Sequence, residues 1–352
     1  MAGFIWLFII QSRIKFWCIL IEKRSETRHM LIAQNVVGNA KKPLKNNFLY
    51  KSKMNINFFS NLFLWLVLIT LPKIAFSQST DFTIQDVKFE SQGVTLAGSI
   101  LTPKNPFAAV VIVHGSDPVK REMEFAKRLA KEGIAVLTYD KRGVGESGGV
   151  YVGPTVGTNN IDTTNLNLLS HDANAAVNTF RTYLKDKKTP IGLVGFSQAG
   201  WIITIAASKN PQIEFMVLFS CPTITTLEQL RFQFYTNGNN NFWENHTEAD
   251  AREHTKNDPD RYQFVATDPK ISLNTLSIPG LWLFGEKDIQ IPVKLCIEQL
   301  NTFKVQGKPF EYTLFSTLGH NTAFDSDTTP FDISIQWIKQ KTLNIKKSKA
   351  SK

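Results

Sequence analysis

Residues 191–208 read IGLVGFSQAGWIITIAAS and decide the fold. The stretch begins with an apolar run typical of a strand buried on both faces and ends with an apolar run of helical length. A single sharp turn at Ser197 separates the two. Such a turn needs small residues two positions away on either side, and Gly195 and Ala199 meet that need. The pattern is that of a nucleophile elbow with Ser197 as the nucleophile, the alternative being a turn serine without chemistry.

Two backbone N–H groups near Ser197 are candidates for an oxyanion hole, which needs two pre-aimed donors. One belongs to Gln198, at the start of the helix that follows the turn. The other belongs to Ser116, which ends the run VHGS behind the apolar strand 108–113. His114 lies in the same run and is predicted to be structural, a catalytic role being the alternative.

Two later loops supply an acid and a base. Asp288 follows the apolar strand 281–284, a place from which a carboxylate can orient an imidazole, and Glu286 is the second choice for this role. His320 lies between the last strand and the last helix, and it is the predicted general base. The three residues therefore occur along the chain in the order Ser197, Asp288, His320. The order nucleophile, acid, base is the one known for the nucleophile-elbow motif.

The remaining histidines of the body are weaker candidates. Ser170, His171 and Asp172 are adjacent, but successive side chains on a helix point about 100° apart and cannot converge. His246 and His254 lie in a polar segment, so we predict solvated surface positions for them.

Strand and helix patterns alternate along the body of the chain. Strands are predicted at 83–89, 94–102, 108–113, 134–139, 191–196, 214–220, 280–284 and 310–315. Helices are predicted at 122–132, 166–185, 198–208 and 331–340. The first two strands form an antiparallel hairpin, and the alternation that follows predicts a mostly parallel sheet covered by helices on both faces.

One long segment, residues 223–276, separates two strands without containing a strand of its own. A connection of this length is too long to be a simple loop, and its stretch Glu248–Tyr262 has a polar helical pattern. We predict an inserted helical cap, the alternative being a surface insertion without a role in binding. Aromatic side chains interleaved in the segment favour a cap that contributes to a pocket. They are Phe232, Phe234, Tyr235, Phe242 and Trp243.

These motifs resemble those of the α/β-hydrolase superfamily, and within it the serine aminopeptidase-like and small-esterase branch of bacterial hydrolases. The resemblance covers about residues 83–342. It includes residues 139–147, YDKRGVGES, which are similar to a D-x-R-G-x-G-x-S loop whose role in many members is mainly structural. The one departure is Ala199, where many members have glycine.

The resemblance implies an α/β-hydrolase fold with a helical cap. Ser197, Asp288 and His320 match the positions of the catalytic triad, and Ser116 and Gln198 match those of the oxyanion hole. A serine hydrolase that cleaves an ester or related acyl bond through an acyl-enzyme is therefore expected. Peptidase, thioesterase or acyltransferase chemistry on the same triad remains an alternative, as does a non-catalytic binding protein on the same scaffold.

Composition and charge exclude several classes of protein. With 43% hydrophobic and 20% charged residues, the chain is neither collagenous, disordered nor a disulfide-stapled miniprotein. The net charge of +10 is concentrated at the front, where residues 1–53 carry +8 and residues 54–77 carry +1. The body, residues 78–352, is therefore close to neutral and has no general attraction for nucleic acid.

The front of the chain has the pattern of a targeting segment. Residues 62–71 form an apolar run with the length of a secretory h-region, too short to span a membrane. We therefore expect 54–77 to be a signal peptide, Gln78 the mature start and the protein to be secreted or periplasmic. A buried core segment is the alternative. Residues 1–53 are expected to result from an over-long start-site assignment, the alternative being an N-terminal anchor.

No cofactor is expected. No cluster of histidine, cysteine and acidic residues has metal-ligand spacing, and the glycines of 143–149 lack the Lys-Ser/Thr ending of a P-loop. The expected partner is a small-molecule acyl substrate. The mature chain has no predicted membrane span, and the oligomeric state is not readable. Cys221 and Cys296 are either free buried thiols or one disulfide.

Overall fold

A computed structural model describes residues 82–153, 159–259 and 264–350, all within the unit Ser77–Lys352. The predictions for the extension 1–53, the signal peptide 54–77 and the start at Gln78 lie outside these residues.

An eight-stranded sheet has the order β1-β2-β4-β3-β5-β6-β7-β8. The pairs β1–β2 and β2–β4 are antiparallel, and all other neighbouring strands are parallel. The strands are β1 (Phe82–Ser91), β2 (Val94–Pro103), β3 (Ala108–Val113), β4 (Ile134–Tyr139), β5 (Ile191–Phe196), β6 (Ile213–Phe219), β7 (Gly280–Gly285) and β8 (Phe310–Phe315). The predicted hairpin and the predicted mostly parallel sheet are confirmed.

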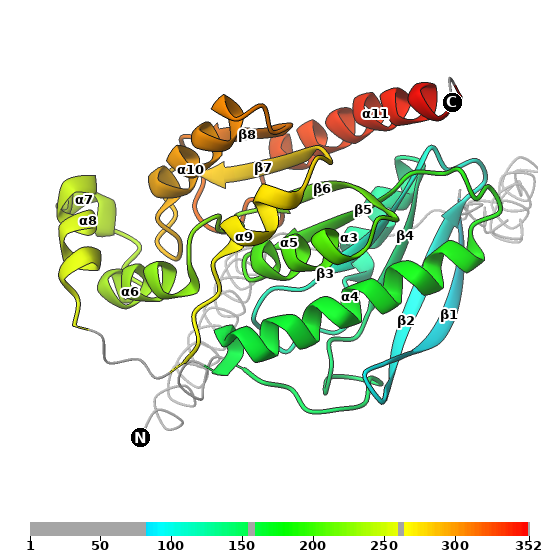
Figure 1. The fold of residues 1–352 in the computed structure, drawn as a ribbon, viewed down its shortest axis with the longest axis horizontal. Helices are drawn as coiled ribbons and strands as arrows, with labels where there is room; N and C mark the ends of the chain where they lie inside the picture. The colour runs from blue at the N-terminus through cyan, green and yellow to red at the C-terminus, as the bar shows by residue number, and fades with distance from the viewer. Residues whose placement is uncertain (1–81, 154–158, 260–263, 351–352) are drawn as a thin grey trace, which may run out of the picture. The chain divides into compact units, whose positions relative to one another are not determined.

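Helices cover both faces of the sheet (Figure 1). One face carries α4 (Thr163–Tyr183), α5 (Ala199–Lys209), α9 (Pro269–Thr275) and α10 (Val293–Val305). The other carries α3 (Met123–Lys131) and α11 (Thr329–Ala350). Successive side chains of β3 point to opposite faces of the sheet. Val111 packs in the core on the α4 and α5 side, and Val110 packs in the core on the α3 and α11 side. This is why the central strands are continuous apolar runs.

The helices α10 and α11 differ from the sequence-based expectation. The helix α10 was not predicted, although its buried residues Cys296, Leu300 and Phe303 recur at helical spacing. The last helix was predicted to end at residue 340, but α11 continues to Ala350 through a lysine-rich stretch. Lysine is a good helix former, and cations are favourable near a helix C-terminus.

The described part of the connection between β6 and β7 consists of helices and loops and contains no strand. Its helices are α6 (Thr226–Thr236), α7 (Phe242–Asn245), α8 (Glu248–Asn257) and α9. A short 3-10 helix, η1 (Asn159–Ile161), lies in a different part of the chain, before α4. Figure 1 shows α6, α7 and α8 gathered together, apart from the layers on the sheet. By contrast, α9 packs on α5 in the main body. The three helices α6 to α8 are called the cap below.

The cap has a small core of its own. Phe232, Phe242 and Ala251 are buried together, and Tyr235 and Trp243 pack against them. Phe232 and Phe242 are therefore buried in this core, whereas Tyr235 and Trp243 line surface pockets. The helix predicted over 248–262 ends at Asn257, because Pro259 disfavours helical backbone at the preceding residue.

Candidate active site

Ser197 sits in the turn between β5 and α5 with a φ of 50°, in the left-handed region that non-glycine residues rarely adopt. The turn is held by the Ser197 N–H, which donates to the carbonyl O of Phe219 on β6 at 3.1 Å. Glycine is required at position 195, since a Cβ there would lie 2.5 Å from the Ala199 Cβ and 2.9 Å from the Val113 carbonyl O. Ala199, the one departure from the expected motif, is accommodated because its Cβ faces this glycine.

The structure brings His320 and Asp288 together. The Nδ1 of His320 lies 2.7 Å from Oδ2 of Asp288, whose side chain is completely buried. The other oxygen, Oδ1, accepts hydrogen bonds from the backbone N–H groups of Gln290 (2.7 Å) and Ile291 (3.0 Å). The carboxylate is therefore fixed in orientation, and it favours the imidazole tautomer with the proton on Nδ1. The Nε2 atom of His320 is left as an acceptor.

Glu286, the second choice for the acid, is not placed at His320. Its side chain is exposed and lines a surface pocket together with Trp243 and Lys294. No hydrogen bond joins the hydroxyl of Ser197 to His320 within the described residues. Such bonds are often long before a substrate is bound.

The two predicted oxyanion donors are unoccupied. Neither the Ser116 N–H nor the Gln198 N–H donates a hydrogen bond to any described residue. Gln198 directly follows Ser197 in the chain. Gly115, the residue before Ser116, lies beside the same turn, since a Cβ placed on Gly115 would be 3.8 Å from the Ser197 Cβ and 3.5 Å from the carbonyl O of Phe196. Two free N–H groups beside a candidate nucleophile are what an oxyanion hole requires.

Comparison with known proteins decides the family. A family model described as serine aminopeptidase, S33, matches residues 104–281, just over half of the chain. The chain belongs to this family of α/β hydrolases. The match contains Ser116, Ser197 and Gln198 and stops before Asp288 and His320. A search of curated proteins found no significant match.

Solved structures resemble the hydrolase in fold. An esterase from Pyrococcus furiosus is 18% identical with a TM-score of 0.54, and the alignment covers 75% of this chain and 93% of the esterase. An acylaminoacyl peptidase from Pyrococcus horikoshii is 14% identical with a TM-score of 0.55, covering 76% and 43%. The α/β hydrolase GrgF from Penicillium sp. sh18 is 16% identical with a TM-score of 0.53, covering 74% and 99%. The chain thus spans less than half of the peptidase.

The cap of the hydrolase holds the loop that carries Asp288. Three cap side chains donate hydrogen bonds to three consecutive carbonyl oxygens of this loop. The pairs are Trp243 Nε1 to Asp288 (2.8 Å), Thr236 Oγ1 to Ile289 (2.6 Å) and Gln229 Nε2 to Gln290 (2.8 Å). Sequence reasoning missed these contacts. The only sign of them in the sequence is that side chains able to donate hydrogen bonds lie among the aromatic residues of the segment.

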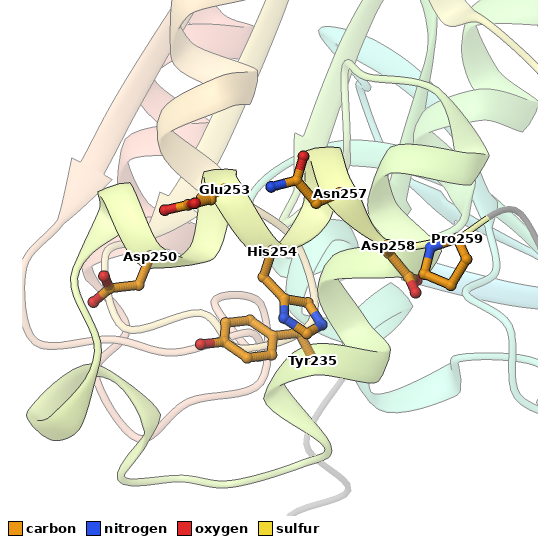
Figure 2. A pocket seen from close by; sticks show the side chains of 7 residues that line it. All are labelled: Tyr235, Asp250, Glu253, His254, Asn257, Asp258 and Pro259. Carbon is orange, nitrogen blue, oxygen red and sulfur yellow. The ribbon is translucent and has the colours of Figure 1, made fainter.

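The histidines of the cap are packed on aromatic rings. His254 stacks on Tyr235 with ring centroids 3.8 Å apart, and His246 stacks on Phe242 at 4.3 Å. Figure 2 shows His254 and Tyr235 in an open pocket of about 490 Å³ between α6 and α8. None of Ser197, Asp288 and His320 lines this pocket. The prediction of solvated surface positions holds for His254, which is exposed, but not for the half-buried His246.

His114 and the adjacent run 170–172 have structural environments. Burial and the nearby charge of Lys141 lower the pKa of His114 to about 3, so its imidazole is neutral at ordinary pH. Its ring packs edge-on against Tyr139 at 4.8 Å. Asp172 is buried and pairs with Arg142 of the YDKRGVGES loop, while His171 is exposed. This loop therefore has the structural role that the resemblance implies.

The two cysteines of the body are both free and buried. Burial raises the pKa of each thiol, that of Cys296 to about 12. Where the structure describes the chain, no three His, Cys, Asp or Glu side chains gather as a metal site. No described helix is both long and apolar enough to cross a membrane.

Proposed function

We propose that the protein is a serine hydrolase that cleaves an ester through Ser197, with His320 as general base and Asp288 as the acid that orients it. The observation that carries this proposal is the hydrogen bond between His320 Nδ1 and the buried Asp288 carboxylate, in a fold whose nucleophile elbow presents Ser197. Family membership supports hydrolysis in general.

The proposed reaction has two halves. The hydroxyl of Ser197 attacks the acyl carbon while its proton passes to Nε2 of His320, and Asp288 stabilises the imidazolium that forms. The N–H groups of Ser116 and Gln198 bind the oxyanion. His320 then protonates the leaving group, and the acyl-enzyme is hydrolysed when His320 takes a proton from water and returns it to Ser197.

The test compares the full chain with its Ser197→Ala variant. Hydrolysis of p-nitrophenyl esters and labelling by a fluorophosphonate probe are followed in parallel. We expect the parent to turn over and to label, and the variant to lose on the order of 10⁴–10⁶ in kcat and all labelling. Ser170→Ala is the matched control, because Ser170 is the serine of the run 170–172 and its hydroxyl donates to the carbonyl O of Asn167 in its own helix. A parent that folds but neither labels nor hydrolyses contradicts the proposal.

Amide hydrolysis is the second candidate, and the family description favours it. A panel of aminoacyl p-nitroanilides, acyl thioesters and p-nitrophenyl esters with matched acyl groups separates the chemistries by kcat/KM. Higher kcat/KM on the anilides than on the esters would replace the ester assignment by a peptidase.

We also propose that the protein is exported, on the basis of the apolar run 62–71 and the small residues near 75–77. Mass spectrometry of the N-terminus of the natural protein tests this proposal. A mature chain that begins near Gln78 supports it, and a peptide from residues 25–50 contradicts it.

A further inference from the structure

A buried cation lies directly behind the candidate oxyanion hole. The side chain of Lys141 follows β4 and is only 2% exposed. Its Nζ donates hydrogen bonds to the carbonyl O of Gly115 at 2.6 Å, to that of Ser116 at 3.1 Å and to Oε1 of Gln198 at 3.2 Å. All three acceptors belong to the two short segments that carry the free N–H groups of the hole.

The contact with Gly115 acts on the first donor through a single peptide unit. The carbonyl O of Gly115 and the N–H of Ser116 belong to the same peptide bond and, in the trans form, point in opposite directions. An ammonium bonded to this oxygen fixes the plane of the peptide and polarises its N–H, because hydrogen bonds in series strengthen one another. The Ser116 N–H is therefore held in place and made a better donor to an oxyanion.

The contact with Gln198 acts on the second donor. The buried Gln198 side chain accepts from Lys141 through Oε1 and donates through Nε2 to the carbonyl O of Asn160 at 2.6 Å. Both polar atoms of the Gln198 amide are thereby held. This limits the movement of Gln198, whose own backbone N–H is the second donor. One ammonium group thus ties the loop after β3 to the start of α5.

We propose that Lys141 is a positioning residue of the oxyanion hole, whose ammonium orients and polarises the Ser116 N–H and restrains Gln198, the residue that carries the second N–H. The inference rests on the proposed function, since it needs an oxyanion formed by attack of Ser197. Lys141 does not touch the substrate in this arrangement, because its three donors face the protein.

The surroundings of Lys141 make its charge sensitive to pH. Burial lowers the pKa of the Lys141 ammonium to about 7, while the carboxylate of Asp117 opposes this effect. The ring of Tyr151 faces the ammonium at 5.4 Å and its hydroxyl donates to the Ser116 carbonyl O at 2.7 Å. His114, also nearby, is neutral. We therefore expect kcat to decline above about pH 7 as Lys141 loses its proton.

The experiment compares the full chain with Lys141→Met and Lys141→Arg, using a p-nitrophenyl ester and a trifluoromethyl ketone. Ser197 Oγ adds to the ketone carbon, its proton passes to His320, and the ketone oxygen becomes an oxyanion in the hole. For Lys141→Met we expect kcat to fall about 10- to 100-fold with little change in KM. This is less than the roughly 10²–10³ lost when a donor itself is removed. The inhibition constant of the ketone should rise by the same factor as kcat falls.

The Arg variant and a surface variant complete the design. Lys141→Arg keeps its charge above pH 12, so it should recover part of kcat and lack the decline above pH 7. Lys127→Met, at a half-buried lysine of α3 whose ammonium pairs with Glu124, is the matched control for the loss of one ammonium. Thermal unfolding checks that each variant is folded. If Lys141→Met does not fold, Lys141→Gln replaces it, because glutamine keeps a hydrogen-bond donor and removes the charge.

The results that overturn the inference differ from the result that overturns the proposed function. A folded Lys141→Met with parental kcat overturns the inference, as does a fall in kcat without a matching loss of ketone affinity. A parent that folds but neither hydrolyses esters nor labels with the fluorophosphonate probe overturns the proposed function, and the inference with it.

Discussion

The indole N–H of Trp243 donates a hydrogen bond of 2.8 Å to the carbonyl O of Asp288. A cap residue thus bonds to the backbone of the very residue whose carboxylate holds His320 at 2.7 Å. The cap and the candidate triad are therefore joined by two hydrogen bonds in series through Asp288. We therefore expect substitutions in the cap to change the catalytic rate through Asp288, even where the substituted residue does not contact the substrate.

Trp243→Phe should lower kcat about fivefold while leaving the fold intact. The substitution keeps an aromatic ring in the cap core but removes the donor to Asp288, and one such bond is worth about 1 kcal/mol. That free energy corresponds to roughly a fivefold change in rate if it is lost from the transition state. Steady-state kinetics on a p-nitrophenyl ester is the measurement.

Trp337→Phe on α11 is the control for this prediction. Its indole N–H has no hydrogen-bond partner among the described residues, so the same substitution removes no bond. If both variants lower kcat equally, the contact with Asp288 is not the cause.

Continuous apolar runs made the central strands predictable. The strands 108–113, 134–139, 191–196 and 310–315 have the predicted bounds, because polar, glycine or proline residues end each run. The elbow at Ser197 was equally readable, since its constraint involves residues only two positions away. Local sequence therefore contains most of the information about the sheet and the nucleophile.

The contacts that support the candidate site were not predictable in this way. Trp243 and Asp288 are 45 positions apart, and Lys141 and Gln198 are 57 apart. Lys141 occupies a variable position of the D-x-R-G-x-G-x-S pattern, so the motif gives no reason to single it out. The same limit applies to Glu286 and Asp288, because the sequence does not show that Asp288 is buried and Glu286 exposed.

Asp288→Asn should lower kcat about 10⁴-fold. An amide at this position no longer stabilises the imidazolium, and it can favour the wrong tautomer of His320. Glu286→Gln makes the same chemical change two residues earlier, on an exposed side chain, and should retain parental kcat. Kinetics of the two variants on the same ester is the measurement. The reverse pattern of activity would assign the acid to Glu286.

Gly195→Ala should destabilise the fold by about 1–3 kcal/mol, the usual cost of overpacking a core. The added methyl group would lie 2.5 Å from the Ala199 Cβ and 2.9 Å from the Val113 carbonyl O. The double variant Gly195→Ala with Ala199→Gly removes the first contact and should recover part of this loss. Denaturant unfolding of the parent, the two single variants and the double variant measures the coupling. Additive effects would mean that the two positions do not compete for space.

Acidification should destabilise the protein through His114. Its pKa is about 3 in the folded state and about 6.5 when exposed, so between these values the unfolded chain binds a proton that the folded chain does not. The contribution of His114 to stability is thus fully present above pH 6.5 and is lost as the pH falls toward 3, by up to about 1.4 kcal/mol per pH unit. Urea unfolding at pH 7, 5.5 and 4 for the parent and for His114→Phe measures this loss. The Phe variant cannot bind the proton, so its stability should fall less steeply. Equal slopes for the two proteins would show that another group controls the acid response.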